Sequence, residues 1–463
     1  MNRNILKIIF INLLFLVSFI GFIYIKNVKT NYESIPSIIT ISTTKSINIT
    51  SNTDFTKYAS SGNGLSTDPY VIENLIIEAN LPGPSKTFSI NINNTNAFFI
   101  IRNCTTIQGY YGIWLNNVSN GVIERNNFSI STHIPVHLTN SSYINITDNI
   151  MMNEKSYGIE LYNSSFNLIY NNSIFNTNYD AIRLWNNSNW NKIDKNKIGH
   201  CALGPFPGFG ILVVNSGHNN ITNNLINDIH GDGIDLQNSN YNKIENNSIE
   251  NVKKDLYTYG ITLINSSFIL IQNCTIENSS NGIQLADNSD NTTIILNNII
   301  NNYFGIYLGH SDNITINNNT IFKNSFTGLY IEWVNFSDIR YNIINNNSND
   351  GIFIQRSYNN TICLNNVSFN LGYGLEILNL AQNNTITFNW FIYNKYPSIY
   401  PTDANVTNII KNNTIIHKIP PIQTTTTEQI PGLLFYTVIS SLVLMGVMLF
   451  FKKYRKMKTN YMF

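Results

Sequence analysis

The chain has few charged side chains and almost no net charge. Its 463 residues include 28 basic and 27 acidic residues, so charged residues make up 12% of the chain and the formal net charge is +1. Without a basic excess there is no electrostatic case for binding nucleic acid. A helical period is also missing, because Asn, Ser and Thr dominate the connecting segments and disfavour helix interiors. This absence argues against leucine-rich repeats, which need a helix or helical turn on their outer side.

The most regular feature of the sequence is a repeated unit. Its first residue recurs at steps of 22 or 23 residues, apart from one step of 29 and one of 27. A fixed period in this range indicates a stacked repeat architecture. The unit begins at Gly112, Pro135, Gly158, Ala181, Gly210, Gly233, Gly260, Gly282, Gly305, Gly328, Gly351 and Gly374.

Each unit reads as two short strands. Apolar residues lie two apart, as in Ile159 and Leu161, and a second strand follows that ends in the pattern Ile-x-x-Asn-x-Ile. This alternation is typical of strands with one side chain in and the next out. The sequence therefore predicts an all-β fold, a single-strand parallel β-helix of about 13–14 coils with about 4.8 Å between coils.

Asparagine recurs at two fixed positions of the unit. Stacked amides can bond to each other and to turn backbone, and asparagine tolerates the left-handed conformation of a sharp corner. The position after the second strand reads Asn126, Asn149, Asn172, Asn196, Asn224, Asn247, Cys274, Asn298, Asn319, Asn342, Asn365 and Asn389. The position after the first strand reads Asn117, Asn140, Asn163, Asn186, Asn215, Asn238 and Asn265. Cys104 and Cys274 occupy the same position about 34 Å apart, which is too far for a disulfide.

The unit Gly-Ile-x-Leu-x-Asn-Ser-x-x-Asn-x-Ile-x-x-Asn-x-Ile resembles the repeats of the NosD-like family, and the segment from Ser61 to Asn74 resembles the one that often precedes the first coil there. The resemblance covers roughly residues 50 to 415 and implies a right-handed parallel β-helix. Such repeats occur among carbohydrate-binding and sugar-hydrolase proteins, and they serve enzymes, binders and structural rods alike. The NosD-like name also implies copper-site maturation, but copper needs clustered ligands. The pairs His133/His137 and His200/Cys201 form no complete site, so we expect no metal and no cofactor.

The two ends of the chain predict a membrane protein. An apolar run from Ile8 to Ile25 is a secretory signal or signal-anchor. The twenty residues from Gly432 to Phe451 carry no charge, and a basic cluster follows, which favours the cytoplasmic side. We expect a cell-membrane protein with a single-pass C-terminal anchor and most of the chain extracytoplasmic. The expected segments are the signal (1–30), a β-rich cap (31–90), the β-helix (91–415), a Pro/Thr stalk (416–431), the transmembrane helix (432–451) and a basic tail (452–463).

The two long steps mark inserts just before Gly210 and Gly260, at the same corner and two coils apart. We expect these loops, one carrying Phe206 and the other Lys253, to wall a trough on the outer face of the first strands. Asp235, Asp232 and His230 lie near its floor as candidate catalytic acids and bases. Candidate ligand-binding residues beside them are Glu160, Arg183, Trp185 and Gln237.

Three outward aromatic residues, Tyr307, Tyr330 and Phe353, follow one another along the same face, at a spacing that suits sugar rings or a protein partner. The leading interpretation is a surface module that binds glycans or partner proteins. The alternatives are a polysaccharide hydrolase or lyase acting at Asp235 and a copper accessory protein. A purely structural reading stays open as well, in which Glu160 and Arg183 pair across strands, the aspartates serve turns and the aromatic rings stack on one another.

Overall fold

The computed structural model describes residues 42–79, 87–130, 133–205, 208–252, 258–378, 380–401 and 407–417. All of these belong to one compact unit, Met1–His417. Within them, no helix is both long enough and apolar enough to span a membrane. The N-terminal apolar run, the stalk after His417, the expected transmembrane helix at 432–451 and the basic tail lie outside the described residues.

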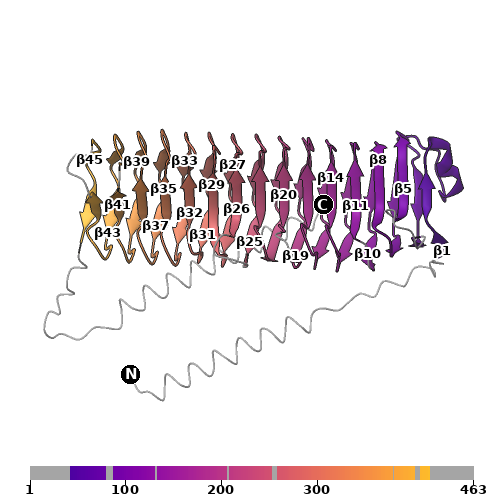
Figure 1. Cartoon of the computed structure of the whole chain (residues 1–463), viewed down its shortest axis with the longest axis horizontal. Helices are drawn as coiled ribbons and strands as arrows, with labels where there is room; N and C mark the ends of the chain where they lie inside the picture. The colour runs from indigo at the N-terminus through magenta and orange to yellow at the C-terminus, as the bar shows by residue number, and fades with distance from the viewer. Residues whose placement is uncertain are drawn as a thin grey trace, which may run out of the picture. The chain divides into compact units, whose positions relative to one another are not determined.

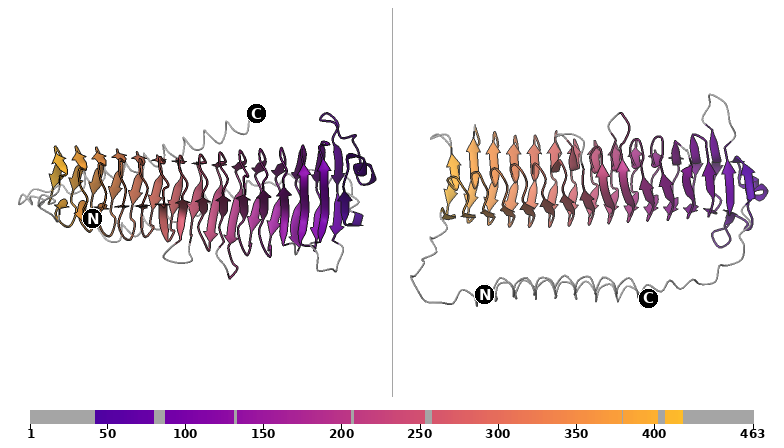
Figure 2. Two further views of the ribbon diagram at one scale, coloured as in Figure 1. Left: turned by 45° about the horizontal axis from the view of Figure 1, so that its top comes forward. Right: turned by 90° about the horizontal axis from the view of Figure 1, so that it is seen from below.

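Three parallel sheets run side by side along one axis (Figure 1). Each turn of the chain adds one strand to each sheet, in the order first, second, third, as the further views show (Figure 2). The first sheet consists of β2 (Ile47–Ile49), β5 (Phe88–Thr95), β8 (Tyr111–Val118), β11 (Ile134–Thr139), β14 (Ile159–Tyr162), β17 (Ile182–Trp185), β20 (Ile211–Val214), β23 (Ile234–Gln237), β26 (Tyr259–Ile264), β29 (Asn281–Ala286), β32 (Ile306–Gly309), β35 (Leu329–Glu332), β38 (Ile352–Gln355), β41 (Leu375–Leu378) and β44 (Ile399–Pro401).

The second sheet consists of β3 (Tyr70–Glu73), β6 (Phe99–Arg102), β9 (Gly121–Glu124), β12 (Asn145–Thr147), β15 (Leu168–Tyr170), β18 (Lys192–Asp194), β21 (Asn220–Thr222), β24 (Lys243–Glu245), β27 (Leu270–Gln272), β30 (Thr293–Ile295), β33 (Thr315–Asn317), β36 (Asp338–Arg340), β39 (Thr361–Cys363), β42 (Thr385–Thr387) and β45 (Ile409–Lys411).

The third sheet consists of β1 (Ser42–Lys45), β4 (Leu75–Glu78), β7 (Thr105–Ile107), β10 (Asn127–Ile130), β13 (Ile150–Met152), β16 (Ser173–Phe175), β19 (Lys197–Cys201), β22 (Leu225–Ile229), β25 (Ser248–Glu250), β28 (Thr275–Glu277), β31 (Asn298–Ile300), β34 (Thr320–Phe322), β37 (Ile343–Asn345), β40 (Asn366–Ser368), β43 (Trp390–Ile392) and β46 (Thr414–Ile416). The predicted parallel solenoid is confirmed.

The solenoid begins earlier than the sequence pattern indicated. Strands β2, β3 and β4 form a complete turn ahead of the expected first coil, and β1 pairs with β4. Residues 42–78 are therefore part of the β-helix and not a separate cap over residues 31–90. A short 3₁₀ helix, η1 (Asn52–Lys57), follows β2 and buries Phe55, whose ring stacks on Tyr70 at 5.0 Å between centroids. The irregular connections between β2 and β4 hid this turn from the period count.

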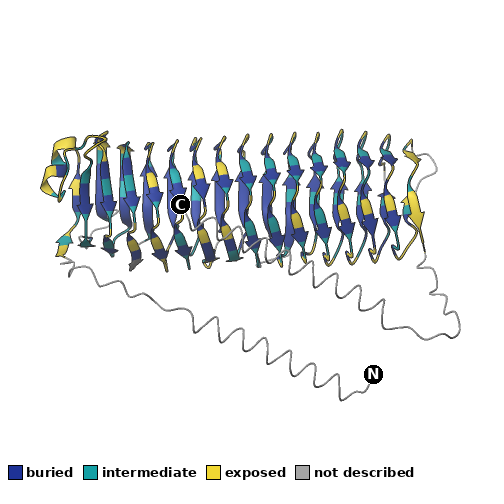
Figure 3. Ribbon diagram, turned by 180° about the vertical axis from the view of Figure 1, so that it is seen from behind, coloured by how far each residue is buried: buried dark blue, intermediate teal, exposed yellow. Residues whose placement is uncertain are grey.

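Branched aliphatic side chains fill the interior of the solenoid. Most strands bury one or two inward residues completely, for example Ile234 and Leu236 on β23, and the burial repeats from turn to turn (Figure 3). The glycine that opens most units lies where the chain enters the first sheet. A Cβ at Gly233 would lie 2.6 Å from the carbonyl oxygen of Gly260 and 2.7 Å from Cγ2 of Ile249. This close approach explains why the smallest residues recur there.

Buried amide rows bind consecutive turns together at the corners. In the row between the second and third sheets, Asn196 Nδ2 donates to Asn224 Oδ1 and Asn224 Nδ2 donates to Asn247 Oδ1, each at 3.0 Å. The predicted row is confirmed with one correction: after Cys274 the position belongs to Asn297, whose Oδ1 accepts the Cys274 backbone N–H, whereas Asn298 begins β31. In the predicted row of exposed amides the side chains bond in separate pairs, as in the 2.6 Å bond from Asn163 Nδ2 to Asn140 Oδ1.

Candidate functional site

The tips of both inserts, residues 206–207 and 253–257, lie outside the described residues, and so do Phe206 and Lys253. The expected walls of the trough therefore stay a prediction. The structure does describe the outer face of the first sheet, where the floor of the trough was expected. Leu212, which points outward on β20, is only 6% exposed.

Asp232 has a structural role at the corner that enters the first sheet. Its Oδ1 accepts the backbone N–H of Tyr259 in the next turn at 2.8 Å. Asp180 accepts the N–H of Phe209 at 2.9 Å in the same way, and Asp350 accepts that of Tyr373 at 2.7 Å. Three aspartates at equivalent positions thus tie one turn to the next, as the alternative turn-forming interpretation expected.

Asp235 lies beside this corner, on β23, and is only 2% exposed. Gln237 Nε2 donates to its Oδ2 at 2.9 Å, and Oδ1 has no hydrogen-bond partner among the described residues. Burial raises the pKa of Asp235 to about 8, with a further contribution from the Asp232 charge. Burial likewise raises the pKa of Asp232 to about 6 and that of Asp180 to about 7.

The structure therefore encloses carboxyls that the sequence pattern placed on the floor of an open trough. The difference arises because an outward strand position is exposed only where nothing packs over it. His230 is half-buried, and its backbone N–H bonds to the Cys201 carbonyl at 3.1 Å. No contact in the described residues brings the three candidate catalytic side chains together on an accessible surface. Their catalytic role stays a prediction.

Glu160 and Arg183 are register neighbours on β14 and β17, but they do not pair with each other. The Glu160 carboxylate lies 2.9 Å from Nδ1 of His137, and both side chains are almost fully buried. Arg183 instead donates to the Tyr157 hydroxyl at 2.6 Å and lies 4.7 Å from the Trp185 ring centroid. The cross-strand ion pair of the structural interpretation is thus wrong, because Glu160 contacts His137 and Arg183 contacts Tyr157 instead.

The three outward aromatic residues Tyr307, Tyr330 and Phe353 stack on one another. Their ring centroids are 5.1 and 4.7 Å apart, with interplanar angles of 9° and 12°. Tyr330 is covered on both faces, and its hydroxyl accepts a 2.8 Å hydrogen bond from Gln355 Nε2. Burial and the nearby Glu332 charge raise the pKa of Tyr330 to about 12. The central ring therefore has no free face for a sugar.

A second aromatic row, which the sequence analysis did not identify, follows the corner between the first and second sheets. We call it the corner row: it comprises Tyr143, Phe166, Trp190, His218, Tyr241 and Phe268, stacked with centroid distances of 4.2 to 6.4 Å. Tyr143 and Trp190 are 59% and 53% exposed, so the outer edges of the rings face solvent. The signal in the sequence is an aromatic residue one position before the corner Asn or Ile, but these rings lie in turns and not in strands.

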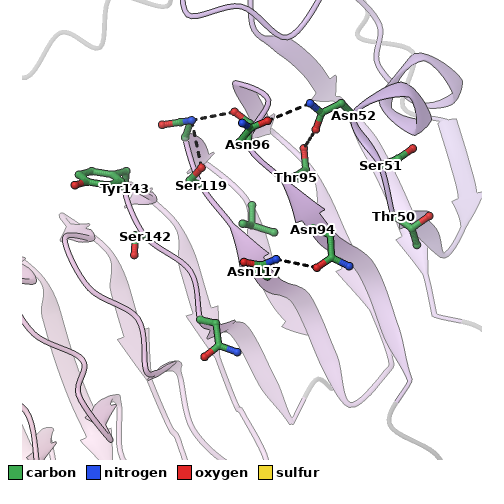
Figure 4. Close-up of a pocket in the computed structure, with 13 residues that line it drawn as sticks. Thr50, Ser51, Asn52, Asn94, Thr95, Asn96, Asn117, Ser119, Ser142 and Tyr143 are labelled. Carbon is green, nitrogen blue, oxygen red and sulfur yellow. Dashed lines mark hydrogen bonds between the residues drawn. The ribbon is translucent and has the colours of Figure 1, made fainter.

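A polar hollow of about 860 Å³ adjoins the start of this row (Figure 4). We call it the corner groove. It is lined by Thr50, Ser51, Asn52, Asn94, Thr95, Asn96, Asn117, Val118, Ser119, Asn120, Asn140, Ser142 and Tyr143. Asn120 holds the position of the corner row one turn before Tyr143, so no ring continues the stack on that side. A second hollow of about 460 Å³ shares Asn52 and Asn96 with the groove and includes the aromatic residues Tyr70 and Phe98.

Hydrogen bonds between side chains hold the groove in shape. Asn52 Nδ2 donates to Asn96 Oδ1 at 3.1 Å, and Asn120 Nδ2 donates to the Asn96 carbonyl at 2.9 Å. Asn117 Nδ2 donates to Asn94 Oδ1 at 2.9 Å. Each amide keeps further donors or acceptors. The groove is thus a preformed surface of amides and hydroxyls with one aromatic ring at its end.

The described part of the chain contains no group of three His, Cys, Asp or Glu side chains placed to hold a metal ion. All four cysteines are buried and unpaired. Burial raises the pKa of Cys104 and of Cys274 to about 11, which makes both thiols poor nucleophiles.

A family model described as the right handed beta helix region matches residues 37–198, 88–236, 180–336 and 335–415. The chain belongs to the right-handed beta helix family. That assignment confirms the predicted handedness, while the narrower NosD-like resemblance stays a prediction. No curated protein sequence matches this right-handed beta helix chain.

Solved structures similar to this right-handed beta helix include the periplasmic alginate epimerase AlgG, at 13% identity over 75% of this chain and 85% of that one, with a TM-score of 0.44. The Azotobacter vinelandii mannuronan C-5 epimerase AlgE4 A-module is 11% identical over 75% and 91%, with a TM-score of 0.41. The catalytic domain of a GH87 alpha-1,3-glucanase in complex with nigerose is 14% identical over 80% and 68%, with a TM-score of 0.38. Likenesses this distant carry no functional argument.

Proposed function

We propose that this chain is a membrane-anchored, extracytoplasmic β-helix that binds glycans at the corner groove. The observation that carries the proposal is the composition of that groove, in which amides and hydroxyls surround a hollow that ends on the exposed ring of Tyr143. Sugars offer hydroxyls to polar side chains and apolar ring faces to aromatic ones. Binding sites for small ligands combine these two kinds of surface in a concave pocket.

Tyr143 is the residue on which the proposal is tested. Its ring stacks on Phe166 at 5.5 Å on one side, and the groove lies on the other. A sugar ring in the groove would extend the corner row by one member. An aromatic pair contributes about 0.5–1.5 kcal/mol beyond its buried area, so removing the ring should weaken binding by roughly fivefold.

The experiment is a glycan array probed with the purified full-length chain and its variants. We expect Tyr143→Ala to bind the same glycans roughly fivefold more weakly than the unchanged protein does. Phe336→Ala is the matched control, because Phe336 is 62% exposed at the equivalent corner position, far from the groove. Equal binding by both variants, or no bound glycan for the unchanged protein, contradicts the proposal.

The membrane anchor belongs to the same proposal and rests on the sequence of the C-terminal segment. We expect residues from about 31 to 431 outside the cell and the chain from Lys452 onward inside. Protease added to intact cells or spheroplasts should then digest the β-helix and spare a tag placed after Phe463. A protected β-helix with a digested tag would reverse this topology.

A further inference from the structure

The corner groove carries no charged side chain among the thirteen residues that line it. The adjoining hollow is likewise lined by uncharged residues only. Acidic glycans and nucleic acids are held by arginine and lysine, which give strong charge-assisted hydrogen bonds to carboxylates and phosphates. The described lining offers no such group.

A carboxylate lies next to the lining of the groove. Thr50, in the groove lining, donates its backbone N–H and its hydroxyl to Oδ2 of Asp54 at 3.0 and 2.9 Å. Lys57 pairs with the same carboxylate at 2.7 Å, and together these bonds hold the pKa of Asp54 well below its usual range. The carboxylate therefore stays ionised, and Lys57 is already paired with it. An anion entering the groove would find no charged side chain among the residues that line it.

The exposed amides of this corner provide the second observation. Asn117 bonds back to Asn94, and Asn140 accepts from Asn163 in the turn that follows. Asn117 and Asn140 are also one turn apart, yet their side chains do not bond to each other, as the close-up shows for Asn117 and its one bonded partner (Figure 4). The amides of this row are thus bonded in pairs, Asn94 with Asn117 and Asn140 with Asn163, and the step between the two pairs falls at the groove. An acceptor on Asn117 and two donors on Asn140 remain for a ligand.

We propose that the corner groove selects a neutral oligosaccharide, whose hydroxyls bond to Asn117 and Asn140 while one sugar ring packs against Tyr143. This inference rests on the proposed glycan-binding function and adds the class of glycan and its polar contacts. A hydroxyl both donates and accepts, so it satisfies the Asn117 acceptor and the Asn140 donors together. A carboxylate only accepts, so at the same place it would leave the Asn117 oxygen without a donor.

The test compares neutral gluco- and manno-oligosaccharides with oligouronates of the same length, titrated against the purified full-length chain. We expect binding of neutral oligosaccharides only. Their affinity should change less than about twofold between about 50 mM and about 500 mM NaCl, because no charged contact is screened. Asn140→Asp keeps the shape and tolerates the left-handed backbone there (φ 48°) but removes both donors. It should weaken binding about fivefold or more.

Asn238→Asp is the matched control, since Asn238 has a φ of 50° in the same row of amides away from the groove, and its Oδ1 accepts from the amide of the next turn as that of Asn140 does. It should bind as the unchanged protein does. Tighter binding of oligouronates, a steep loss of affinity with salt, or equal effects of the two substitutions would overturn the inference while leaving a glycan-binding protein. Binding of neither class of oligosaccharide would overturn the proposed function itself.

Discussion

The buried amide row is the feature whose energetic role can be calculated most directly, and Asn224 is its best test position. Asn224 Oδ1 accepts the backbone N–H of Asn196 at 2.9 Å and its Nδ2 at 3.0 Å. Asn224 Nδ2 donates to the carbonyl of Ile193 and to Asn247 Oδ1, both at 3.0 Å. Leucine has a similar size and can make none of these four bonds.

The expected loss follows from the groups left behind. Asn224→Leu takes a partner from two buried backbone groups, at a cost of about 1–3 kcal/mol each. Burial of the leucine offsets about 1.5–3 kcal/mol of that cost. The net destabilisation should be about 1–3 kcal/mol. Because long repeat arrays can depart from two-state unfolding, a local measurement is preferable to a global one.

Hydrogen exchange at the Asn196 amide provides that measurement. A loss of about 2 kcal/mol should speed its exchange by a factor on the order of 30. The matched control is Asn220→Leu, an exposed position on β21 in the same turn, which should leave exchange at Asn196 almost unchanged. Equal rates in the two variants would refute the reasoning that the amide row holds the turns together.

Two further predictions concern the outer face of the first sheet. The pKa of Asp235 in the folded protein is raised to about 8, so the protonated carboxyl favours folding, and the free energy of unfolding should fall as pH rises from about 4 to about 8. Asp235→Asn should remove part of this pH dependence. A melting temperature that depends equally on pH in both proteins would contradict the prediction. In the central stack, Tyr330→Phe keeps the rings but loses the hydrogen bond from Gln355, so it should cost about 1 kcal/mol against about 3–5 kcal/mol for Tyr330→Ala. Urea unfolding of both variants should rank them in that order, and the reverse order would show that stacking does not stabilise this face.

The sequence predicts the solenoid well because the same physical demand recurs in every turn. A small residue is needed where Gly233 meets the next turn, an aliphatic residue fills each inward position such as Ile234, and an amide is needed at the corner where Asn224 lies. Each requirement therefore places a particular kind of residue at a fixed spacing in the sequence. The turn formed by β2, β3 and β4 was not predicted because its connections break that spacing.

Exposure of outward residues was much harder to predict. Strand alternation places Asp235 and Tyr330 outside, but it does not reveal that Asp235 is enclosed or that both faces of the Tyr330 ring are covered. The corner row was missed for a related reason. Tyr143 and Phe166 lie in turns with φ near 60°, a conformation that bulky residues seldom adopt, so the strand pattern gives no indication of them.

The interruption at Cys274 has a mechanical consequence. Asn247 Nδ2 donates to the Ile221 carbonyl at 2.8 Å, but toward the next turn it meets the Cys274 sulfur at 3.9 Å, where other members of the row make 3.0 Å bonds to an amide oxygen. In the same turn Ile269 replaces the buried amide that Asn242 supplies one turn earlier. A rod pulled along its axis fails where its cross-links are weakest. Under tension along its axis, this solenoid should part first between β24–β25 and β27–β28, and the segments on either side should keep their own stacking.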